Sequence, residues 1–358
     1  MIEWKRWTFL KGNFSMKGLD YLDKKKVVLC GVPGMKNEDI VKMESYLREE
    51  YNNLDFLFLG ENTLEKEELI NNCKDVEILI SWDQEVDEEV YGKLNLRAYL
   101  AASTGFNAAN VEAATKYNVV VSNAKDYCKD EVATHAMMYI LACARKLFLM
   151  LPYVKEGNWG LSTIGKIKSF KDSTVGILGL GSIGSNVAKK LSGFGVKIIS
   201  CDPNVSSTDM EELGVIKVDF DTLLKESDYL SLHTPLLPST KEVINLEALK
   251  KMKPTSYLIN TSRGGVVKQD DLYFALTNGI IAGAGLDVLE HEPPKVSDKF
   301  LINLPNVMVT PHSAYLSEEA SDAQLRITAQ EAGRILRNEA PINLVNPQIL
   351  VNLTWIKK

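Results

Sequence analysis

Short apolar runs alternate with longer charged, helix-like stretches along almost the whole chain, and this alternation limits the folds open to it. The runs are continuously apolar, which is typical of strands buried on both faces of a parallel sheet. Helical crossovers between such strands predict an α/β fold. The runs form two sets, one at 27–32, 56–59, 76–80, 97–102 and 119–122, the other at 174–178, 196–201, 229–233, 257–260, 281–287 and 307–310.

The second set contains the six strands of a complete doubly wound dinucleotide-binding fold. The chain has 358 residues, which is enough for about two domains. We therefore expect two doubly wound parallel-sheet domains. The main helical patterns lie at 38–50, 110–117, 127–151 and 318–337.

Charge and composition argue against several classes of partner. The formal net charge is -6, so there is no basic field to attract nucleic acid or an anionic membrane surface. No apolar run reaches the ~20 residues of a membrane span, and the first 14 residues lack the apolar core of a secretory signal. The five cysteines include no C-x-x-C pair, so neither a disulfide framework nor a zinc site is expected. We expect a cytoplasmic protein without a bound metal.

A glycine-rich segment follows the predicted strand 174–178 and precedes a helical pattern. It matches G-x-G-x-x-G, the fingerprint of a dinucleotide site in this context. Gly179 would allow the tight turn, Gly181 would let the backbone approach the pyrophosphate, and Gly184 would let the helix pack close to the strand. The free N–H groups of the helix N-terminus would face the phosphates. The six residues are Gly179, Leu180, Gly181, Ser182, Ile183 and Gly184.

An acidic residue stands where this motif requires one. Asp202 follows the predicted strand 196–201 and lies 18 residues after Gly184. A carboxylate there can accept hydrogen bonds from the ribose hydroxyls and repels a 2′-phosphate, so NAD is the expected cofactor. The alternative is that Asp202 only forms a turn before Pro203.

Three further segments place polar residues directly after predicted strands. They span 260–265, 283–293 and 310–314, and they contain Arg263, Asp287, Glu292 and His312. Ligands of a doubly wound sheet bind at the carboxyl ends of its strands, so we expect these side chains to converge. Singly, each has an ordinary structural explanation, such as helix capping by the arginine.

These residue types suit the oxidation of a 2-hydroxy acid, which removes a hydride from C2 and a proton from the hydroxyl. Histidine can take that proton near neutral pH. Arginine can bind the substrate carboxylate through two parallel hydrogen bonds. A carboxylate beside the histidine fixes its tautomer and stabilises the imidazolium. The pattern predicts an NAD-dependent enzyme acting on a small 2-hydroxy or 2-keto acid.

The same segments resemble the D-isomer-specific 2-hydroxyacid dehydrogenases over nearly the whole chain after the first strand. The matching motifs are Thr-Ser-Arg-Gly-Gly, Leu-Asp-Val-x-x-x-Glu-Pro and Thr-Pro-His. The resemblance implies that His312 is the acid/base, that Glu292 is its partner and that Arg263 anchors the substrate. It also implies that Asp287 contacts the nicotinamide side of the cofactor.

The resemblance extends to ligand contacts outside these motifs. The loop after 97–102 resembles the family's carboxylate-binding loop, with Ser103 in place of the usual glycine and Asn107 in place of aspartate. The segment 233–236 resembles one that lines the cofactor crevice, which favours a structural role for His233. The expected cofactor contacts are Gly179, Gly181, Ser182, Ile183, Gly184, Asp202, His233, Thr234, Pro235, Thr261, Ser262, Asp287 and Ala314. The expected substrate contacts are Ser103, Thr104, Gly105, Tyr127, Arg263 and His312.

The resemblance also implies a domain organisation and an assembly. A Rossmann NAD-binding domain at 126–314 would be inserted into a flavodoxin-like substrate-binding domain formed by 1–125 and 315–358. A two-fold homodimer would form through the NAD-binding domain. The helical pattern at 131–147 is apolar on several faces, so it must be buried. Burial within one subunit is the alternative.

Two other functions fit part of the pattern. Residues 123–133 resemble the subgroup nearest the C-terminal-binding proteins, although that subgroup commonly has aspartate where Thr134 stands. Those corepressors keep the catalytic residues, so an NAD(H)-sensing interaction protein is the alternative function; the acidic balance and the absence of a basic tail favour the enzyme. Formate dehydrogenase shares the architecture but pairs its histidine with glutamine, so Glu292 argues against it.

Overall fold

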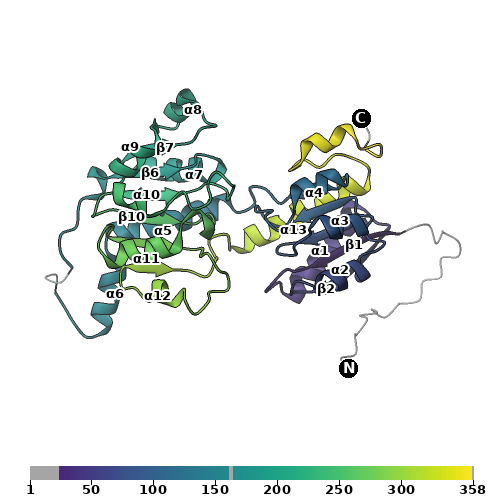
Figure 1. The fold of residues 1–358 in the computed structure, drawn as a ribbon, viewed down its shortest axis with the longest axis horizontal. Coiled ribbons are helices and arrows are strands. Elements are labelled where there is room, and N and C mark those ends of the chain that lie inside the picture. The colour runs from purple at the N-terminus through teal and green to yellow at the C-terminus, as the bar shows by residue number, and fades with distance from the viewer. Residues whose placement is uncertain (1–23, 161–163, 357–358) are drawn as a thin grey trace. The chain divides into compact units, whose positions relative to one another are not determined.

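The computed structural model describes residues 24–160 and 164–356 (Figure 1). The chain divides into two compact units, Met1–Lys125 with Leu325–Lys358 and Asp126–Gln324. Each unit contains one parallel sheet, as the alternating pattern predicts. The N-terminal segment inspected for a secretory signal lies outside the described residues.

The first unit is built on a five-stranded sheet with the order β2-β1-β3-β4-β5. All four pairs are parallel, and this order is that of flavodoxin-like sheets. All five predicted strands are confirmed. They are β1 (Lys25–Cys30), β2 (Leu54–Gly60), β3 (Ile78–Ser81), β4 (Ala98–Ala101) and β5 (Val120–Asn123).

Both faces of this sheet are covered by helices, which explains the continuously apolar strands. On β1, Val27 and Leu29 face α1 (Asn37–Glu50) and α13 (Glu318–Leu336). The alternate residues Val28 and Cys30 face the opposite layer. That layer consists of α2 (Lys66–Asn72), α3 (Glu88–Lys93) and α4 (Val111–Lys116).

The C-terminal segment returns to this unit and covers the outer edge of β5. The buried side chain of Asn346 accepts a hydrogen bond from the N–H of Val121 at 2.9 Å and donates one to the carbonyl of Val119 at 3.0 Å. Glu331 of α13 accepts from the Ser122 hydroxyl at 2.8 Å. The amide of Asn346 thus occupies backbone groups that a sheet edge leaves unpaired, and Glu331 binds a side chain of the same strand. The segment ends in the 3-10 helix η4 (Pro347–Val351).

The second unit contains a seven-stranded parallel sheet with the order β12-β11-β10-β9-β6-β7-β8. Its first six strands in chain order lie as 3-2-1-4-5-6, the arrangement of dinucleotide-binding sheets. All six predicted strands are confirmed, and the exposed two-residue strand β8 (Ile216–Lys217) is added to them. The six are β6 (Thr174–Leu178), β7 (Lys197–Cys201), β9 (Tyr229–Leu232), β10 (Tyr257–Asn260), β11 (Gly283–Leu286) and β12 (Val307–Val309).

Two helical layers enclose this sheet. One layer contains α5 (Lys129–Ala144) and α7 (Ser182–Leu191), which pack on Val175 and Ile177 of β6. The other packs on Leu230 and Leu232 of β9. It contains α9 (Phe220–Glu226), α10 (Leu246–Lys251), α11 (Gln269–Thr277) and α12 (Lys299–Ile302). The unit also contains α8 (Ser207–Glu212) and the 3-10 helices η1 (Phe170–Asp172), η2 (Ser192–Phe194) and η3 (Gly264–Val266).

The single helix predicted over 127–151 is wrong, because the chain forms two helices there. α5 ends at Ala144 and α6 covers Leu147–Lys155. Between them Lys146 has φ 51° and ψ 39°, a left-handed conformation that ends a helix. The two helices meet at 68°. No single helix in the described ranges is long and apolar enough to span a membrane; only this bent pair, taken together, reaches that length and composition.

The boundary expected at 314/315 lies later, at 324/325 and inside α13. Ala320, in the first turn of this helix, packs with Cys128 and Val132 of the second unit. From Leu325 onward the helix contributes its apolar residues to the core of the five-stranded sheet. The boundary between the two units therefore lies where the packing partners of the helix change, and not where the helix begins.

A buried carboxylate in the second unit joins β9 to β6 at the N-terminal ends of these two strands. Asp228 precedes β9 and is only 8% exposed. It accepts hydrogen bonds from the N–H of Thr174 at 2.8 Å and from the ammonium groups of Lys168 and Lys253, each at 2.9 Å. Burial pushes the pKa of Asp228 up, but these donors outweigh burial and the pKa lies below its usual value.

We expect Asp228→Asn to destabilise the protein by about 1–3 kcal/mol at pH 7, because the donors use both carboxylate oxygens and an amide is neutral and has only one acceptor atom. Since the pKa is lowered in the folded state, the contribution is present above roughly pH 4 and disappears as the pH falls through the folded pKa. Urea denaturation between pH 7 and pH 3 measures this. Asp221→Asn, which alters an exposed pair with Lys251, is the control and should stay within about 0.5 kcal/mol. Equal effects of the two variants would contradict the assignment.

Candidate active site

The glycine-rich loop connects β6 to α7 at the point where the strand order reverses. Gly179 has φ 88°, and a side chain there would lie 2.9 Å from the carbonyl oxygen of His233. A side chain at Gly184 would overlap the carbonyl oxygen of Gly179. The tight turn and the close packing of helix on strand account for these two glycines.

Gly181 has no such structural explanation. Its φ of -71° is open to any residue, and a side chain there would meet no atom of the chain within 4 Å. The space above it is what a pyrophosphate needs if it is to approach the backbone and the N-terminus of α7. In the described part of the chain the buried hydroxyl of Thr261, another expected cofactor contact, has no hydrogen-bond partner. These residues fit a dinucleotide.

Asp202 lies directly after β7 and is bonded to the glycine loop. Its carboxylate accepts from the N–H of Leu180 at 2.7 Å and from the N–H of Asn204 at 2.8 Å. A carboxylate has about four acceptor positions, so two bonds leave capacity for ribose hydroxyls. Asp202 is therefore more than a turn residue, because it joins the ends of two strands.

His233 follows β9, next to the glycine loop. Its Nε2 lies 2.8 Å from the hydroxyl of Ser231. Burial lowers the pKa of His233 to about 4. The ring is therefore neutral at pH 7 and cannot act as an imidazolium proton donor, which supports a structural role. The backbone of His233 and Thr234, with Pro235 after them, lies against Gly179.

The loop that carries Arg263 is organised by Asn260 at the end of β10. The side-chain oxygen of Asn260 accepts from the N–H of Ser262 at 3.0 Å, and its NH₂ donates to the carbonyl of Arg263 at 3.0 Å. A side chain at Gly264 would overlap the carbonyl oxygen of Leu289. The Arg263 loop and the loop that leads to Glu292 thus touch backbone to backbone.

Glu292 and His312 form the hydrogen-bonded pair that the motifs predict. Nδ1 of His312 lies 2.5 Å from Oε2 of Glu292, and the other carboxylate oxygen accepts from the N–H of Leu289 at 2.8 Å. Burial raises the pKa of Glu292, but the hydrogen bond and charge of His312, the N–H of Leu289 and the charge of Arg263 lower it more. The net pKa lies below its usual value, so the carboxylate stays charged at neutral pH.

Asp287 follows β11 as expected and is enclosed by the turn that carries His312. It is 2% exposed, and its carboxylate accepts from the N–H groups of Ser313 and Ala314, each at 2.9 Å. It also accepts from the hydroxyl of Thr310 at 2.5 Å. Asp287 and Ala314 thus fix the loop that carries His312, and the contact of these two residues with the cofactor stays a prediction.

Aromatic side chains surround this region. Tyr315 contacts the ring of His312 edge to face, with 6.2 Å between ring centroids. Burial raises the pKa of Tyr127 and the thiol of Cys128 adds to the effect, while the positive charge of Arg263 opposes it. Tyr127 therefore lies in the electrostatic reach of the arginine. Ile183, in the first turn of α7, packs with the same cluster.

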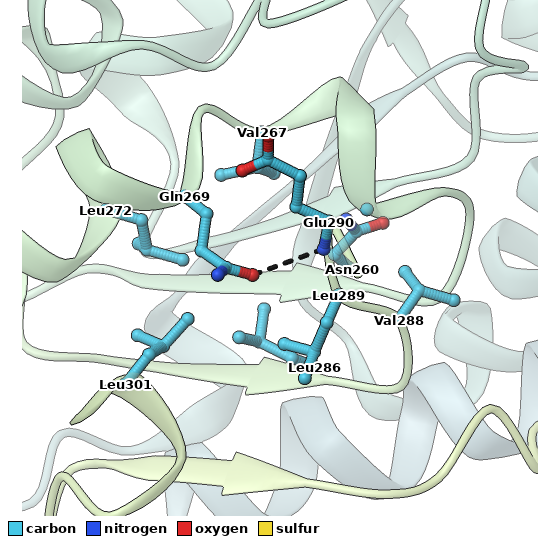
Figure 2. A pocket seen from close by; sticks show the side chains of 10 residues that line it. Asn260, Val267, Gln269, Leu272, Leu286, Val288, Leu289, Glu290 and Leu301 are labelled. Carbon is cyan, nitrogen blue, oxygen red and sulfur yellow. Dashed lines mark hydrogen bonds between the residues drawn. The ribbon is translucent and has the colours of Figure 1, made fainter. Parts of the chain in front are cut away.

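A small hollow lies behind the two touching loops and is separate from the predicted catalytic side chains. Its cavity volume is about 10 Å³, far below the ~300–1,000 Å³ of typical ligand pockets. Figure 2 shows its mainly apolar lining and the bond from the N–H of Glu290 to the side chain of Gln269. Neither Arg263, Glu292 nor His312 lines it. We therefore assign it to packing behind the site.

The remaining expected substrate contacts belong to the first unit, in the loop after β4. The Ser103 hydroxyl donates to the carbonyl of Gly105 at 2.6 Å, and the carbonyl of Thr104 accepts from Asn123 at 2.7 Å. Ser103 does not have a positive φ, so the loop does not need the glycine usual at that position. The hydroxyl of Ser103 fixes the turn through its bond to Gly105.

Comparisons with known proteins agree with this geometry. The family described as D-isomer specific 2-hydroxyacid dehydrogenase, NAD binding domain, matches residues 137–314. A glyoxylate reductase of Korarchaeum cryptofilum is 38% identical over 308 residues, which are 84% of this chain and 92% of the relative. The chain belongs to the D-isomer-specific 2-hydroxyacid dehydrogenase family.

Two further members extend the comparison. A hydroxypyruvate reductase of Thermotoga maritima is 37% identical over 278 residues, 76% of this chain and 88% of the relative. The NAD complex of a D-isomer specific 2-hydroxyacid dehydrogenase from Lactobacillus delbrueckii ssp. bulgaricus has a TM-score of 0.72 at 29% identity. The match covers 90% of this chain and all of that one. The chain is an NAD-dependent 2-hydroxyacid dehydrogenase, and NAD is its cofactor.

Sequence reasoning missed residues that position the family's motifs. Asn260 and Thr310 stand inside the segments that were singled out, but an amide and a hydroxyl have no predicted catalytic task. His135 and Tyr139, which contact Thr310 from α5, lie about half the chain away from it. No local pattern could have indicated that contact.

We expect Gly181→Ala to change the free energy of unfolding by less than about 1 kcal/mol, since the new methyl group meets no protein atom. It should weaken NADH binding by about tenfold or more, a cost of roughly 1.4 kcal/mol, because the methyl group occupies the pyrophosphate position. Fluorescence titration with NADH and thermal unfolding measure the two effects.

Gly184→Ala is the matched control. Its methyl group would overlap the Gly179 carbonyl, so it should destabilise the fold itself by about 1–3 kcal/mol. Unchanged NADH affinity in Gly181→Ala would show that the pyrophosphate lies elsewhere.

Proposed function

We propose that this dehydrogenase interconverts small 2-keto acids, such as glyoxylate and hydroxypyruvate, with the corresponding 2-hydroxy acids, of D configuration where C2 is chiral, using His312 as acid/base and Arg263 as substrate anchor. The observation that carries the proposal is the bond between Nδ1 of His312 and the charged carboxylate of Glu292. The printed names of the related reductases support the substrate class.

His312 would transfer the proton. Its Nδ1 is engaged by Glu292, which leaves Nε2 for the substrate oxygen at C2. In reduction the imidazolium gives its Nε2 proton to the developing alkoxide; in oxidation the neutral ring takes the hydroxyl proton. NAD, when bound, accepts or supplies the hydride at C2.

Glu292 would stabilise the charged form of His312 and hold its ring. The carboxylate is fixed from its other side by the N–H of Leu289, so it offers His312 an acceptor in a set position. Arg263 would bind the substrate carboxylate with its planar fork, and its loop is rigid because Asn260 and Gly264 fix the backbone.

The other proposed ligand contacts fall into two groups. Backbone N–H groups of Ser103, Thr104 and Gly105 would bind the substrate carboxylate, and Tyr127 would border the substrate. The cofactor would contact the glycine loop with Ser182 and Ile183, Asp202, the 233–235 segment, and Thr261 and Ser262. Asp202 would accept hydrogen bonds from the ribose, which favours NADH over NADPH.

An NAD(H)-sensing interaction protein, suggested by the resemblance of 123–133 to the C-terminal-binding subgroup, is the weaker proposal. The catalytic residues do not discriminate between the two. The relatives reported above are named as reductases, which favours turnover. The described cysteines form no disulfide, which is in keeping with a cytoplasmic enzyme. Oxidation of NADH with a panel of 2-keto acids discriminates between the proposals.

A homodimer is also proposed, on the apolar surface of the second unit. The expectation that 131–147 is buried on all faces is only partly right: Met137 and Ile140 are buried, but Met138 is 45% exposed and Leu147 42%. Helix α6 is strongly apolar and contains no buried residue. Such a surface exceeds the scattered apolar residues of ordinary monomers, and a second copy would cover it.

We expect His312→Ala to lower turnover in keto-acid reduction by a factor on the order of 10² or more, the range of general acid–base catalysis. His312→Gln should be equally impaired, because an amide cannot carry the proton. Glu292→Gln should bind substrate but lose reduction at a lower pH than the parent enzyme, since the imidazolium is less stabilised. Steady-state kinetics from pH 5 to 9 measure these effects. Near-normal turnover of His312→Ala would overturn the mechanism.

We expect a dimer mass in solution at micromolar concentration. The double variant Leu151→Glu/Val154→Glu should shift the mass to that of a monomer, because two charges would be buried without partners. Light scattering after size exclusion measures this. Val41→Glu, at a position 62% exposed on α1, is the matched control and should remain dimeric. A monomeric parent protein would contradict the proposal.

A further inference from the structure

The backbone at His312 has an uncommon conformation. Its φ is 49°, in the left-handed region that residues other than glycine rarely adopt. Such a conformation persists where the surroundings determine it. The N–H of His312 donates to the carbonyl of Asp287 at 2.8 Å and to that of Thr310 at 3.0 Å. The contacts that hold this turn therefore decide where the imidazole points.

The side chain of Asp287 holds the turn from both sides of His312. After it in the chain, the N–H groups of Ser313 and Ala314 donate to the two carboxylate oxygens. Before it, the hydroxyl of Thr310 donates to the oxygen that also binds Ser313. The carboxylate is an acceptor in each of these bonds, because backbone N–H groups can only donate.

Among the described residues that donate to the Asp287 carboxylate, Thr310 connects this set of bonds to α5. A hydroxyl has a single proton, and that proton is committed to Asp287. Nε2 of His135, at 2.9 Å, must therefore donate to the hydroxyl oxygen. The hydroxyl of Tyr139 lies 2.7 Å from the same oxygen and 2.9 Å from the carbonyl of Leu286. His135 and Tyr139 lie one turn apart on α5.

The state of His135 agrees with this assignment. Its side chain is 16% exposed and lies 3.7 Å from Asp287. Burial lowers the pKa of His135, and the charge of Asp287 opposes that shift. The net pKa lies below its usual value, so the ring is neutral at pH 7 and carries one proton. The bond to Thr310 assigns that proton to Nε2.

We propose that Thr310 is a positioning residue that transmits the placement of α5, through His135 and Tyr139, to Asp287 and so to the acid/base His312. The inference rests on the proposed function, in which His312 transfers the proton. Thr310 touches no substrate in this scheme. Its loss should lower the rate of the proton-transfer step and leave the binding of NADH and substrate largely unchanged.

The decisive pair of variants is Thr310→Val and Thr310→Ser. Valine keeps the shape of threonine without the hydroxyl, whereas serine keeps the hydroxyl. We expect Thr310→Val to lower kcat on the order of tenfold or more, with the KM for glyoxylate and the Kd for NADH within about twofold of the parent. Thr310→Ser should restore kcat to within about threefold of the parent. A purely structural role would shift the thermal midpoint without this split of kcat from KM.

A double-mutant cycle tests the connection to α5. His135→Leu should lower kcat in the parent enzyme but have no further effect in Thr310→Val, because its influence passes through the missing hydroxyl. His135→Gln, which retains a donor N–H, should restore part of the activity. The cycle also tests the proposal if Thr310→Val alone folds poorly, since His135→Leu and His135→Gln can be compared with Thr310→Ser.

Two outcomes would overturn the inference. One is equal kcat in Thr310→Val and Thr310→Ser; the other is an equal fall of kcat on His135→Leu in both backgrounds. His312→Ala separates this failure from a failure of the proposed function. If His312→Ala is inactive and Thr310→Val is not impaired, only the positioning role is wrong. If His312→Ala turns over normally, the catalytic assignment itself is wrong.

Discussion

The parallel pairing of β6 with β9 is the contact on which the site depends. These strands are separated in sequence by β7, β8 and the helices between them, yet Leu178 pairs with Leu232 at their carboxyl ends. From β6 the chain continues to strands on one side of the sheet, and from β9 it continues to strands on the other side. This reversal of strand order leaves a crevice at the switch point. The glycine loop and the backbone of His233 meet there. β10, β11 and β12 then add one functional loop each at the same edge.

Contacts between backbones convert this topology into a fixed geometry. Gly264 lies against the carbonyl of Leu289, which couples the Arg263 loop to the loop of Glu292. Asp287 couples that second loop to the turn of His312 through side-chain and main-chain bonds. These contacts fix the loops that carry Arg263, Glu292 and His312, which follow three different strands. Most of the contacts involve the backbone, so the loops do not depend on flexible side chains for their position.

Local patterns were sufficient to predict most of the fold and the pairing of Glu292 with His312. Buried parallel strands are continuous apolar runs, and the glycine and histidine motifs follow them directly. The failures have physical causes. Lys146 takes a left-handed conformation inside an apolar helical pattern, and two exposed residues of β8 carry no strand signal. The burial of Asp287, the boundary inside α13 and the contact of His135 with Thr310 depend on tertiary packing between distant segments.

The pair of Glu292 and His312 also explains why a carboxylate, and not an amide, suits this position. Oε1 accepts the N–H of Leu289 and Oε2 faces Nδ1 of His312, so the side chain must accept at both oxygens. An amide has one acceptor atom and would present its NH₂ group to one of the two donors. If it kept the bond to Leu289, it would donate to Nδ1 and so favour the neutral ring. Burial works against the charge of Glu292, but the donors and cations around it lower its pKa. Only the charged carboxylate accepts from both neighbours, and it would stabilise the imidazolium that the proposed reduction requires.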